Sequence, residues 1–418
     1  MRVEIETEQY HKTQCRYCDS KLPPPFLKLG TMALANSFLF PNQVEGEFSC
    51  PLQLTRCSAC SLVQLTHVVP KELMFSDYLY VSSTTRTFQK HFSKYVQSVK
   101  GKLPRNKNVL AVDIGSNDGL LLSCFQKEGI NAVGIEPAQN LSDQANQNGR
   151  KTINRFFDQA CVESILSEYG PAHVITANNV FAHIDHIQDV CKNTLRLLRP
   201  AGFFVIEFPY LITMMDQLLF DMIYHEHLSY ISIASLNHLL NRFHMEIFCI
   251  EKVASHGGSL RVFIQKKGET RIVSRDVQKF INLETNSDYL SETACETFAQ
   301  KVQSVKEELL QYIIDIKTKK KSISAYGAPA KANTIINFCG LNQTQIDYIV
   351  DDNPLKQNRL TPGAHIPVVS RNHLLNQPTD YVIIFAWNFA KEIINNLEHL
   401  KRRGVQFIIP LPKPRLIS

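Results

Sequence analysis

Short apolar runs alternate with amphipathic stretches over two long parts of the chain. In the first part the pattern predicts strands at 108–115, 131–137, 173–180 and 202–209. In the second part it predicts a strand, a glycine turn and a helix within 322–337, and further strands at 346–352, 380–388 and 405–412. Strands that alternate with helices are typical of parallel sheets with crossover helices. The sequence therefore predicts an α/β protein with two such domains in tandem.

The rest of the chain shows other patterns. Residues 1–70 are short apolar pieces separated by proline, glycine and cysteine pairs, which indicates a small module organised by a metal. Apolar residues in 71–102 recur at spacings of three and four and predict a helix, and residues 270–321 are polar and helical. We therefore predict three domains, at 1–70, 71–270 and 271–418.

Five of the eleven cysteines lie within the first 60 residues, and four of them form the pairs Cys15 with Cys18 and Cys57 with Cys60. Two residues between cysteines let both thiolates face one ion, and two such pairs make the closed tetrahedral site of structural zinc. The alternative is that these cysteines are free or redox-active. The 38 residues between the pairs are expected to form a loop or a small sheet, and Cys50 is expected to stay outside the site.

The composition and charge of the chain indicate which kinds of partner the protein can bind. The chain has 418 residues, 44% of them hydrophobic and 20% charged, as in an ordinary globular protein. The net charge of +6 is too small to indicate a nucleic-acid partner. The most apolar stretch, 203–220, is interrupted by Glu207, Pro209 and Asp216, whereas a membrane span needs about 20 nearly uncharged residues. We expect a cytoplasmic protein that binds neither nucleic acid nor membranes.

A glycine turn follows the first strand of the first α/β part. Gly115 and Gly119 let the backbone approach a ligand, and the helix after them offers N–H groups at its positive end. The acids Asp113 and Asp118 would repel a pyrophosphate, whereas Glu136, 21 residues after Gly115, is suited to accept ribose hydroxyls. These features resemble the S-adenosylmethionine site of class I methyltransferases, and the alternative is a doubly wound fold with incidental acids. The resemblance implies S-adenosylmethionine as the donor, bound by Asp113, Gly115, Asn117, Asp118, Gly119, Glu136 and Asn178.

Polar side chains cluster after the fourth strand of this part. Tyr224, His225, Glu226 and His227 are adjacent, and His183 lies just past the third strand. Histidines two residues apart face the same side of an extended segment. A neutral histidine is a suitable base at pH 7, a carboxylate can orient it, and a tyrosine can donate to a developing oxyanion. The alternative is a set of packed histidines with satisfied hydrogen bonds.

Nearly the whole chain, residues 13–415, resembles the sugar C-methyltransferases that methylate C3 of nucleotide-linked 4-keto deoxysugars. The resemblance rests on the cysteine pairs, the DIGSNDG turn, the YHEHLSY segment, and the motifs at 256–262, 326–334 and 351–368. It implies a small zinc-binding module, a class I (Rossmann-like) methyltransferase domain and a second Rossmann-like α/β domain that helps to hold the nucleotide sugar.

The resemblance also implies residue roles. His227 would remove the C3 proton, and Tyr224, Glu226, His183 and Tyr78, rather than its neighbour Tyr80, would line the sugar and steady the enolate. Further substrate contacts would come from Asn179, His225, Lys331 and Asn333. Ala332 stands where the family pattern has glycine, which weakens the expected close ligand contact there.

The proposed chemistry is consistent with the residues, because a C3 proton beside a C4 ketone is acidic and the base and the two substrates need only be aligned. The sequence leaves the nucleotide open between dTDP and GDP, and we expect a monomer. Asp351 and Asp352 could bind a ribose or cap a loop. Competing hypotheses are an O- or N-methyltransferase acting on a small molecule, an RNA methyltransferase or other zinc-dependent nucleic-acid-binding protein, and an inactive scaffold.

Overall fold

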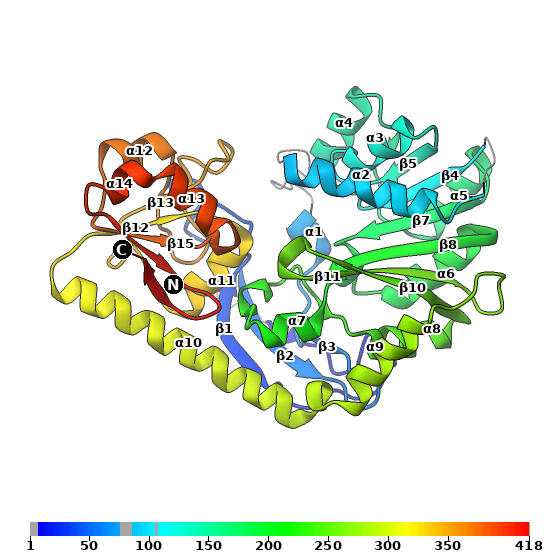
Figure 1. The fold of residues 1–418 in the computed structure, drawn as a ribbon, viewed down its shortest axis with the longest axis horizontal. Helices are drawn as coiled ribbons and strands as arrows, with labels where there is room; N and C mark the ends of the chain where they lie inside the picture. Colours follow the sequence, from blue (N-terminus) through cyan, green and yellow to red (C-terminus); the bar gives the residue numbers. More distant parts are fainter. Residues whose placement is uncertain (1–6, 76–85, 105–107, 418) are drawn as a thin grey trace.

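The structure is a computed structural model that describes residues 7–75, 86–104 and 108–417. Their strands form three sheets, of four, seven and six strands. Figure 1 shows the four-stranded N-terminal sheet where two larger α/β parts meet, one around each of the other sheets. Tyr78 and Tyr80, named in the sequence analysis, lie outside the described residues.

The seven-stranded sheet forms the central part, in the order β10-β11-β8-β7-β4-β5-β6. Its strands are β4 (Leu110–Ile114), β5 (Asn131–Ile135), β6 (Thr152–Ile153), β7 (Ala172–Asn178), β8 (Leu198–Pro209), β10 (Met245–Val253) and β11 (Ser259–Lys266). β11 runs antiparallel to both neighbours, and the pairs from β6 to β8 are parallel. The strand order reverses between β4 and β7, and ligands bind at the carboxyl ends of the strands beside such a reversal.

Helices cover both faces of this sheet. They are α2 (Arg86–Lys100), α3 (Leu120–Lys127), α4 (Gln139–Gln147), α5 (Gln159–Glu168), α6 (Ile187–Leu197) and α8 (Ile233–Arg242), and the short helix α7 (Leu211–Asp216) follows β8. Successive strand residues point to opposite faces, so Ala111 packs with α2 and α3 while Val112 packs with α5 and α6. A helix was predicted over 71–102. The structure has α1 (Lys71–Phe75) and α2 within this range, and the residues between them are not described.

The N-terminal sheet takes its fourth strand from the central part. β1 (Leu27–Ala33), β2 (Ser49–Arg56) and β3 (Val63–Leu65) form an antiparallel meander, and β1 and β2 lie between the cysteine pairs, where a loop or a small sheet was expected. β9 (Ser229–Tyr230) then pairs with β3. Because β9 directly follows residues 224–227, that polar segment lies against the N-terminal sheet.

The C-terminal part is a second parallel sheet, in the order β14-β13-β12-β15-β16-β17, with β17 antiparallel to β16. The strands are β12 (Ile323–Tyr326), β13 (Ile349–Val350), β14 (Val368–Val369), β15 (Tyr381–Ile384), β16 (Gln406–Ile409) and β17 (Arg415–Ile417). The helices are α11 (Ala330–Phe338), α12 (Arg371–Asn376), α13 (Ala390–Asn396) and α14 (Glu398–Lys401). The predicted fold class is confirmed. The exact domain boundaries stay a prediction.

Two helices connect the central and C-terminal parts. α9 (Arg275–Asn286) is followed by α10 (Glu292–Thr318), which runs along the edge of the molecule in Figure 1. One apolar cluster contains buried residues from all three parts, among them Leu29, Phe220 and Phe338, and the rings of Phe220 and Phe338 are 5.6 Å apart. Within the described residues, the helices are too short or too polar to span a bilayer.

Glu284 on α9 caps the N-terminus of α8. Its carboxylate is 1% exposed and accepts hydrogen bonds from the N–H groups of Ile233 (2.8 Å) and Ala234 (2.6 Å) and from the Tyr210 hydroxyl (2.6 Å). The first N–H groups of a helix have no partner within the helix. Glu284 therefore satisfies donors that would otherwise be buried without a partner.

Replacing this carboxylate should destabilise the fold. We expect Glu284→Ala to lower the free energy of unfolding by about 2 kcal/mol, because three buried donors lose their acceptor. Urea denaturation measures this change. Glu296→Ala, at an exposed position of α10, is the matched control and should unfold like the wild type. Equal stability of the two variants would contradict the role assigned to Glu284.

Candidate functional site

Four cysteine sulfurs meet in the N-terminal module. The Sγ atoms of Cys15, Cys18, Cys57 and Cys60 all lie within 4.8 Å of one another. The Cys15–Cys60 and Cys18–Cys57 distances are both 3.5 Å, against about 3.8 Å between sulfurs that share a tetrahedral zinc. The hydrogen bond with Cys60 lowers the pKa of Cys15 to about 5. Cys50 lies outside the cluster, as expected, and burial raises the pKa of its thiol to about 12.

The two cysteine pairs lie in matching turns. Asp19 N–H donates to the Cys15 carbonyl and Ser61 N–H to the Cys57 carbonyl, both at 2.9 Å. Asp19 and Ser61 adopt positive φ angles of 62° and 59°, which turn the chain back on itself. Both thiols of each pair therefore face one point, and four protein ligands leave a zinc ion no open coordination position. The site fits a structural ion.

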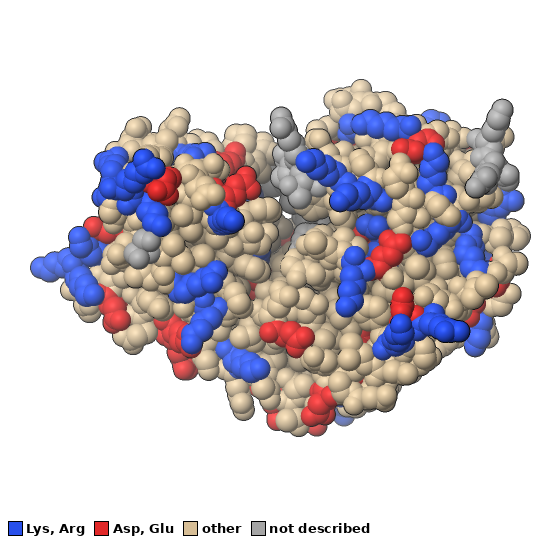
Figure 2. Space-filling model, in the orientation of Figure 1, with Lys and Arg blue, Asp and Glu red and all other residues tan. Residues whose placement is uncertain are grey.

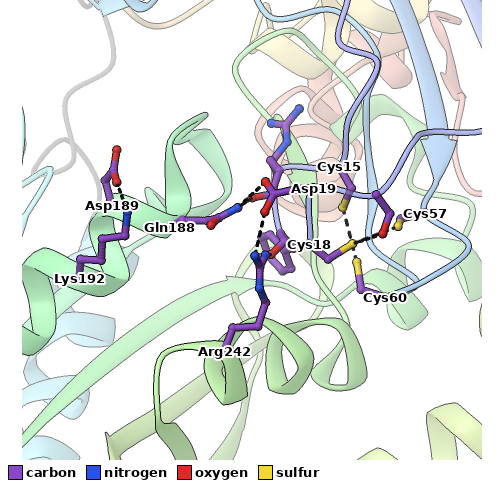
Figure 3. Close-up of polar contacts among 12 residues, drawn as sticks. Cys15, Cys18, Asp19, Cys57, Cys60, Gln188, Asp189, Lys192 and Arg242 are labelled. Carbon is purple, nitrogen blue, oxygen red and sulfur yellow. Dashed lines mark hydrogen bonds and ion pairs between the residues drawn. The ribbon is translucent and has the colours of Figure 1, made fainter.

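The first cysteine turn is bound to the central part (Figure 3). The Asp19 carboxylate accepts hydrogen bonds from Arg242 Nη2 on α8 and from Gln188 Nε2 on α6, each at 2.8 Å. Arg242 Nη1 also donates to the Tyr17 carbonyl. The zinc turn is thereby held in place against two helices of the central part.

The glycine turn lies at the carboxyl end of β4, beside the reversal of strand order. Gly115 and Gly119 have φ angles of 67° and 76°. A Cβ atom on Gly115 would lie 2.4 Å from Val180 Cγ2, so the turn needs glycine for close approach as well as for its backbone conformation. α3 starts directly after Gly119, which directs its first N–H groups toward this edge of the sheet.

Two buried acids support the turn. Glu136 Oε2 accepts the Asn117 N–H and Oε1 the Ala138 N–H, both at 2.9 Å, and burial raises the Glu136 pKa. Since a carboxylate offers about four acceptor positions, two are left for ribose hydroxyls. Asp113 Oδ1 accepts from Thr176 Oγ1 at 2.5 Å, and burial raises the Asp113 pKa to about 7.

Other buried polar atoms at this edge have no hydrogen-bond partner among the described residues. They include both carboxylate oxygens of Asp118, which is 0% exposed, and Asn179 Oδ1. Asn178 ends β7 beside the buried Tyr95 hydroxyl. Buried polar atoms normally have partners, and a ligand with ammonium and hydroxyl donors would supply them. The residues present therefore fit S-adenosylmethionine.

The polar segment at 224–227 is a turn, so the expectation that its histidines face one side was wrong. His227 N–H donates to the Tyr224 carbonyl at 2.9 Å. His225 Nε2 donates to the Cys50 carbonyl at 3.0 Å, so its ring faces the N-terminal sheet. Burial lowers the His225 pKa to about 4. This neutral ring has a structural contact, which argues against its predicted contact with substrate.

His227 faces the other aromatic residues of the predicted site. Its ring centroid is 4.0 Å from that of Tyr224 and 4.9 Å from that of His183, which comes from the short helix after β7. His227 Nδ1 is 2.7 Å from the Met222 carbonyl, which can only accept. Nδ1 therefore carries the proton of the neutral ring, and Nε2 carries the lone pair that a general base needs.

The neighbouring Glu226 is held by the N-terminal module. Glu226 is 5% exposed, and its Oε1 accepts a hydrogen bond from Asn36 Nδ2 at 2.5 Å. Asn36 follows β1, in the segment between the two cysteine pairs. The sequence analysis missed Asn36, because a contact across 190 residues leaves no local signal.

Lys331 and Asn333 extend the site into the C-terminal part. Lys331 Nζ donates to Asn388 Oδ1 at 2.7 Å and lies 4.5 Å from the centre of the Trp387 ring. Asn333 Nδ2 donates to the Ala35 carbonyl at 2.6 Å, so one face of its amide has a structural contact. Figure 2 shows the surface hollowed where the central and C-terminal parts meet.

A buried aspartate behind Lys331 was also missed. Asp221 is 0% exposed, accepts from Trp387 Nε1 at 2.7 Å and lies 3.9 Å from Lys331 Nζ. Burial raises the Asp221 pKa. The position of Asp221 three residues before Tyr224 in the sequence was the one available signal.

Asp351 and Asp352, left open between two roles, hold loops of the C-terminal part. Asp351 accepts the N–H groups of Ala328 and Asn353, both at 2.8 Å. Asp352 accepts the Tyr326 hydroxyl at 2.8 Å. These contacts favour the capping role.

Comparisons with known proteins cover each part of the chain. Family profiles match at 15–75 (zinc binding domain), 85–249 (methyltransferase domain) and 254–412 (C-methyltransferase C-terminal domain). The curated C-methyltransferase NovU of Streptomyces niveus is 32% identical over 406 residues, which are 97% of this chain and 97% of that protein.

Solved structures are more distant. Magnesium protoporphyrin IX methyltransferase from Synechocystis, with bound S-adenosylmethionine, is 13% identical with a TM-score of 0.32, over 43% of this chain and 79% of that one. An S-adenosylmethionine-dependent methyltransferase from Clostridium acetobutylicum is 13% identical with a TM-score of 0.34, over 43% of this chain and 92% of that one.

The glycine turn, its acids and the four-cysteine cluster define an S-adenosylmethionine-dependent methyltransferase that carries a structural zinc module. The similarity to NovU extends through all three parts of the chain. The chain belongs to the C-methyltransferase family that its motifs resemble, and its methyl acceptor is a carbon atom.

The zinc assignment predicts a metal content. Purified protein should hold one zinc ion per chain by elemental analysis, and Cys15→Ser with Cys18→Ser should lose it and yield less soluble protein, because two of four ligands are gone. Cys50→Ser is the matched control and should keep its zinc. A wild-type protein without zinc would overturn the assignment.

The buried Asp113 predicts a pH dependence of stability. Its folded pKa of about 7 lies above the unfolded value near 3.8, so the folded state binds more protons in between, and stability falls as pH rises from about 4 to 7. Asp113→Asn removes this charge, and at pH 8 it should be more stable than the wild type by up to about 4 kcal/mol.

Chemical denaturation of both proteins at pH 5 and pH 8 measures this difference. At pH 5 the advantage of Asp113→Asn should be much smaller, because the wild-type carboxyl is then protonated. The same difference at both pH values would contradict the raised pKa. Asp143→Asn, at an exposed position of α4, controls for general charge effects.

Proposed function

We propose that the protein transfers a methyl group from S-adenosylmethionine to C3 of a nucleotide-linked 4-keto-6-deoxyhexose, with His227 as the base. The observation that carries this proposal is the hydrogen bond from His227 Nδ1 to the Met222 carbonyl, with the rings of Tyr224 and His183 next to the His227 ring. It sets the neutral tautomer in which the lone pair of the ring is on Nε2, the atom that would take a proton from carbon. S-Adenosylmethionine supplies an electrophilic methyl group when bound.

The first step is removal of the C3 proton. The ketone at C4 makes this proton acidic, because the carbanion is an enolate, and the C3–H electron pair becomes the enolate π bond while His227 Nε2 takes the proton. A positioned base of this kind accelerates proton transfer by about 10²- to 10⁴-fold. Tyr224 and His183 are suited to donate hydrogen bonds to the enolate oxygen.

The second step depends on alignment. The donor residues lie at the carboxyl ends of β4, β5 and β7, and His183 follows β7 directly, so both sites share one edge of the sheet. Holding two reactants in line contributes on the order of 7–11 kcal/mol to lowering a barrier. The enolate carbon would take the methyl group as the S–CH3 bond breaks, and the sulfur would keep that electron pair and leave as a neutral thioether.

A sugar with a nucleotide is supported by the C-terminal part. Lys331 is half-buried, with Nζ over the Trp387 ring, and it offers a cation for a diphosphate with an aromatic ring nearby. Lys356 is a second half-buried cation, and its Nζ donates to the Ala328 carbonyl at 2.8 Å, in the turn before α11. The family relationship to NovU supports a C-methyl product.

The test uses purified protein, S-adenosylmethionine and a panel of dTDP- and GDP-linked 4-keto-6-deoxyhexoses, in light and heavy water. Mass spectrometry should find a product one methylene heavier, and deuterium should enter C3 of one substrate. If the donor binds but neither product nor exchange appears, the proposed acceptor is wrong, and a carbon atom of another substrate becomes the better hypothesis.

His227→Asn tests the base. The amide can keep the hydrogen bond to the Met222 carbonyl but cannot take a proton, so C3 exchange and turnover should fall at least about 100-fold. Binding of S-adenosylmethionine by calorimetry should stay as in the wild type. His238→Asn, at an exposed position of α8, should be fully active. Full activity of His227→Asn would remove His227 as the base.

A further inference from the structure

Asn36 reaches the catalytic segment from the zinc module. It lies in a tight turn after β1, in which Ser37 N–H donates to the Leu34 carbonyl at 3.0 Å. From there its amide donates to Glu226 Oε1 at 2.5 Å. Glu226 lies between His225 and His227, in the turn that carries the proposed base.

The chemistry of this contact favours the ionised form of Glu226. An amide nitrogen can only donate, so Oε1 must accept, and a hydrogen bond to a carboxylate favours the ionised form. A bond to a charged acceptor is also short and directional. Asn36 therefore fixes the orientation of the Glu226 carboxylate and stabilises its charge at a 5% exposed position.

The turn that carries Asn36 is itself held from the other side. The carbonyl of Ala35 accepts from Asn333 Nδ2 on α11 at 2.6 Å. The next residue of α11, Thr334, donates through Oγ1 to the Ile223 carbonyl at 2.8 Å, one residue before Tyr224. Asn36 thus lies between the C-terminal part and the catalytic turn, with hydrogen bonds on both sides that fix its position.

We propose that Asn36 is a positioning residue for the reaction, which acts through Glu226 to hold an oriented, ionised carboxylate beside the bound sugar. The zinc module then contributes to turnover as well as to folding. This inference rests on the proposed function, because it assigns Glu226 to the acceptor site.

The first test compares Asn36→Ala with Asn42→Ala, an exposed asparagine of the same segment. Asn36→Ala should lower kcat and the rate of C3 deuterium exchange by about 10- to 100-fold, because a hydrogen bond to a charged group is lost. Asn42→Ala should match the wild type. Zinc content and affinity for S-adenosylmethionine should be unchanged in both, which shows that the variants are folded.

The second test uses charge. Asn36→Asp places a second carboxylate beside Glu226, and ionising both carboxyls at this short distance is unfavourable. As the pH falls, the pair therefore binds a proton. The protonated carboxyl can then donate a hydrogen bond in place of the lost amide. The ratio of wild-type to Asn36→Asp kcat should therefore decrease from pH 8 to pH 6. For Asn36→Ala the same ratio should stay constant.

A purely structural role of the Asn36–Glu226 hydrogen bond would give different kinetics. Asn36→Ala would then lose thermal stability but keep its kcat, and Asn36→Asp would show a constant ratio; either outcome overturns the proposal. Failure of the proposed function is distinguishable, because the wild-type protein itself would then show no product and no exchange.

Discussion

The backbone at 223–227 has to be held by contacts from outside, because it forms no regular helix or strand of its own. The Cys50 carbonyl accepts from His225, and Thr334 donates to the Ile223 carbonyl, so the N-terminal sheet and α11 bind it from two sides. The Met222 carbonyl in turn sets the tautomer of His227. The geometry of the proposed base is therefore a property of three parts of the chain together.

Burial of charge is the second constraint on this site. Asp113, Asp118 and Glu136 lie within one edge of the sheet and are at most 7% exposed. Burying such groups is unfavourable unless they are paired or neutral. The raised pKa of Asp113 and Glu136 and the unpartnered oxygens of Asp118 mark an edge that is stabilised by binding a cationic ligand.

The sequence predicted those features that depend on local pattern. Apolar runs bounded by turns located β4, β5, β7 and β8, and the C-x-x-C spacing located both cysteine turns. The conformation of residues 224–227 was mispredicted, because a hydrogen bond to Cys50, which is far away in the sequence, helps to hold this segment as a turn. Asn36 and Asp221 were missed for the same reason, since their partners Glu226 and Trp387 lie far away in the sequence. The β10–β11 hairpin was not predicted either, because polar residues interrupt the apolar pattern in both strands.

The pairing of β3 with β9 has a consequence for how the chain is made. Val63 pairs with Tyr230, so the N-terminal sheet cannot be completed until more than half of the chain has left the ribosome. The cysteine turns and β1–β3 emerge first and have a partner missing along one edge, and exposed strand edges are prone to pair with other chains. Metal binding at that early stage would hold the three strands together while the central sheet is still being synthesised.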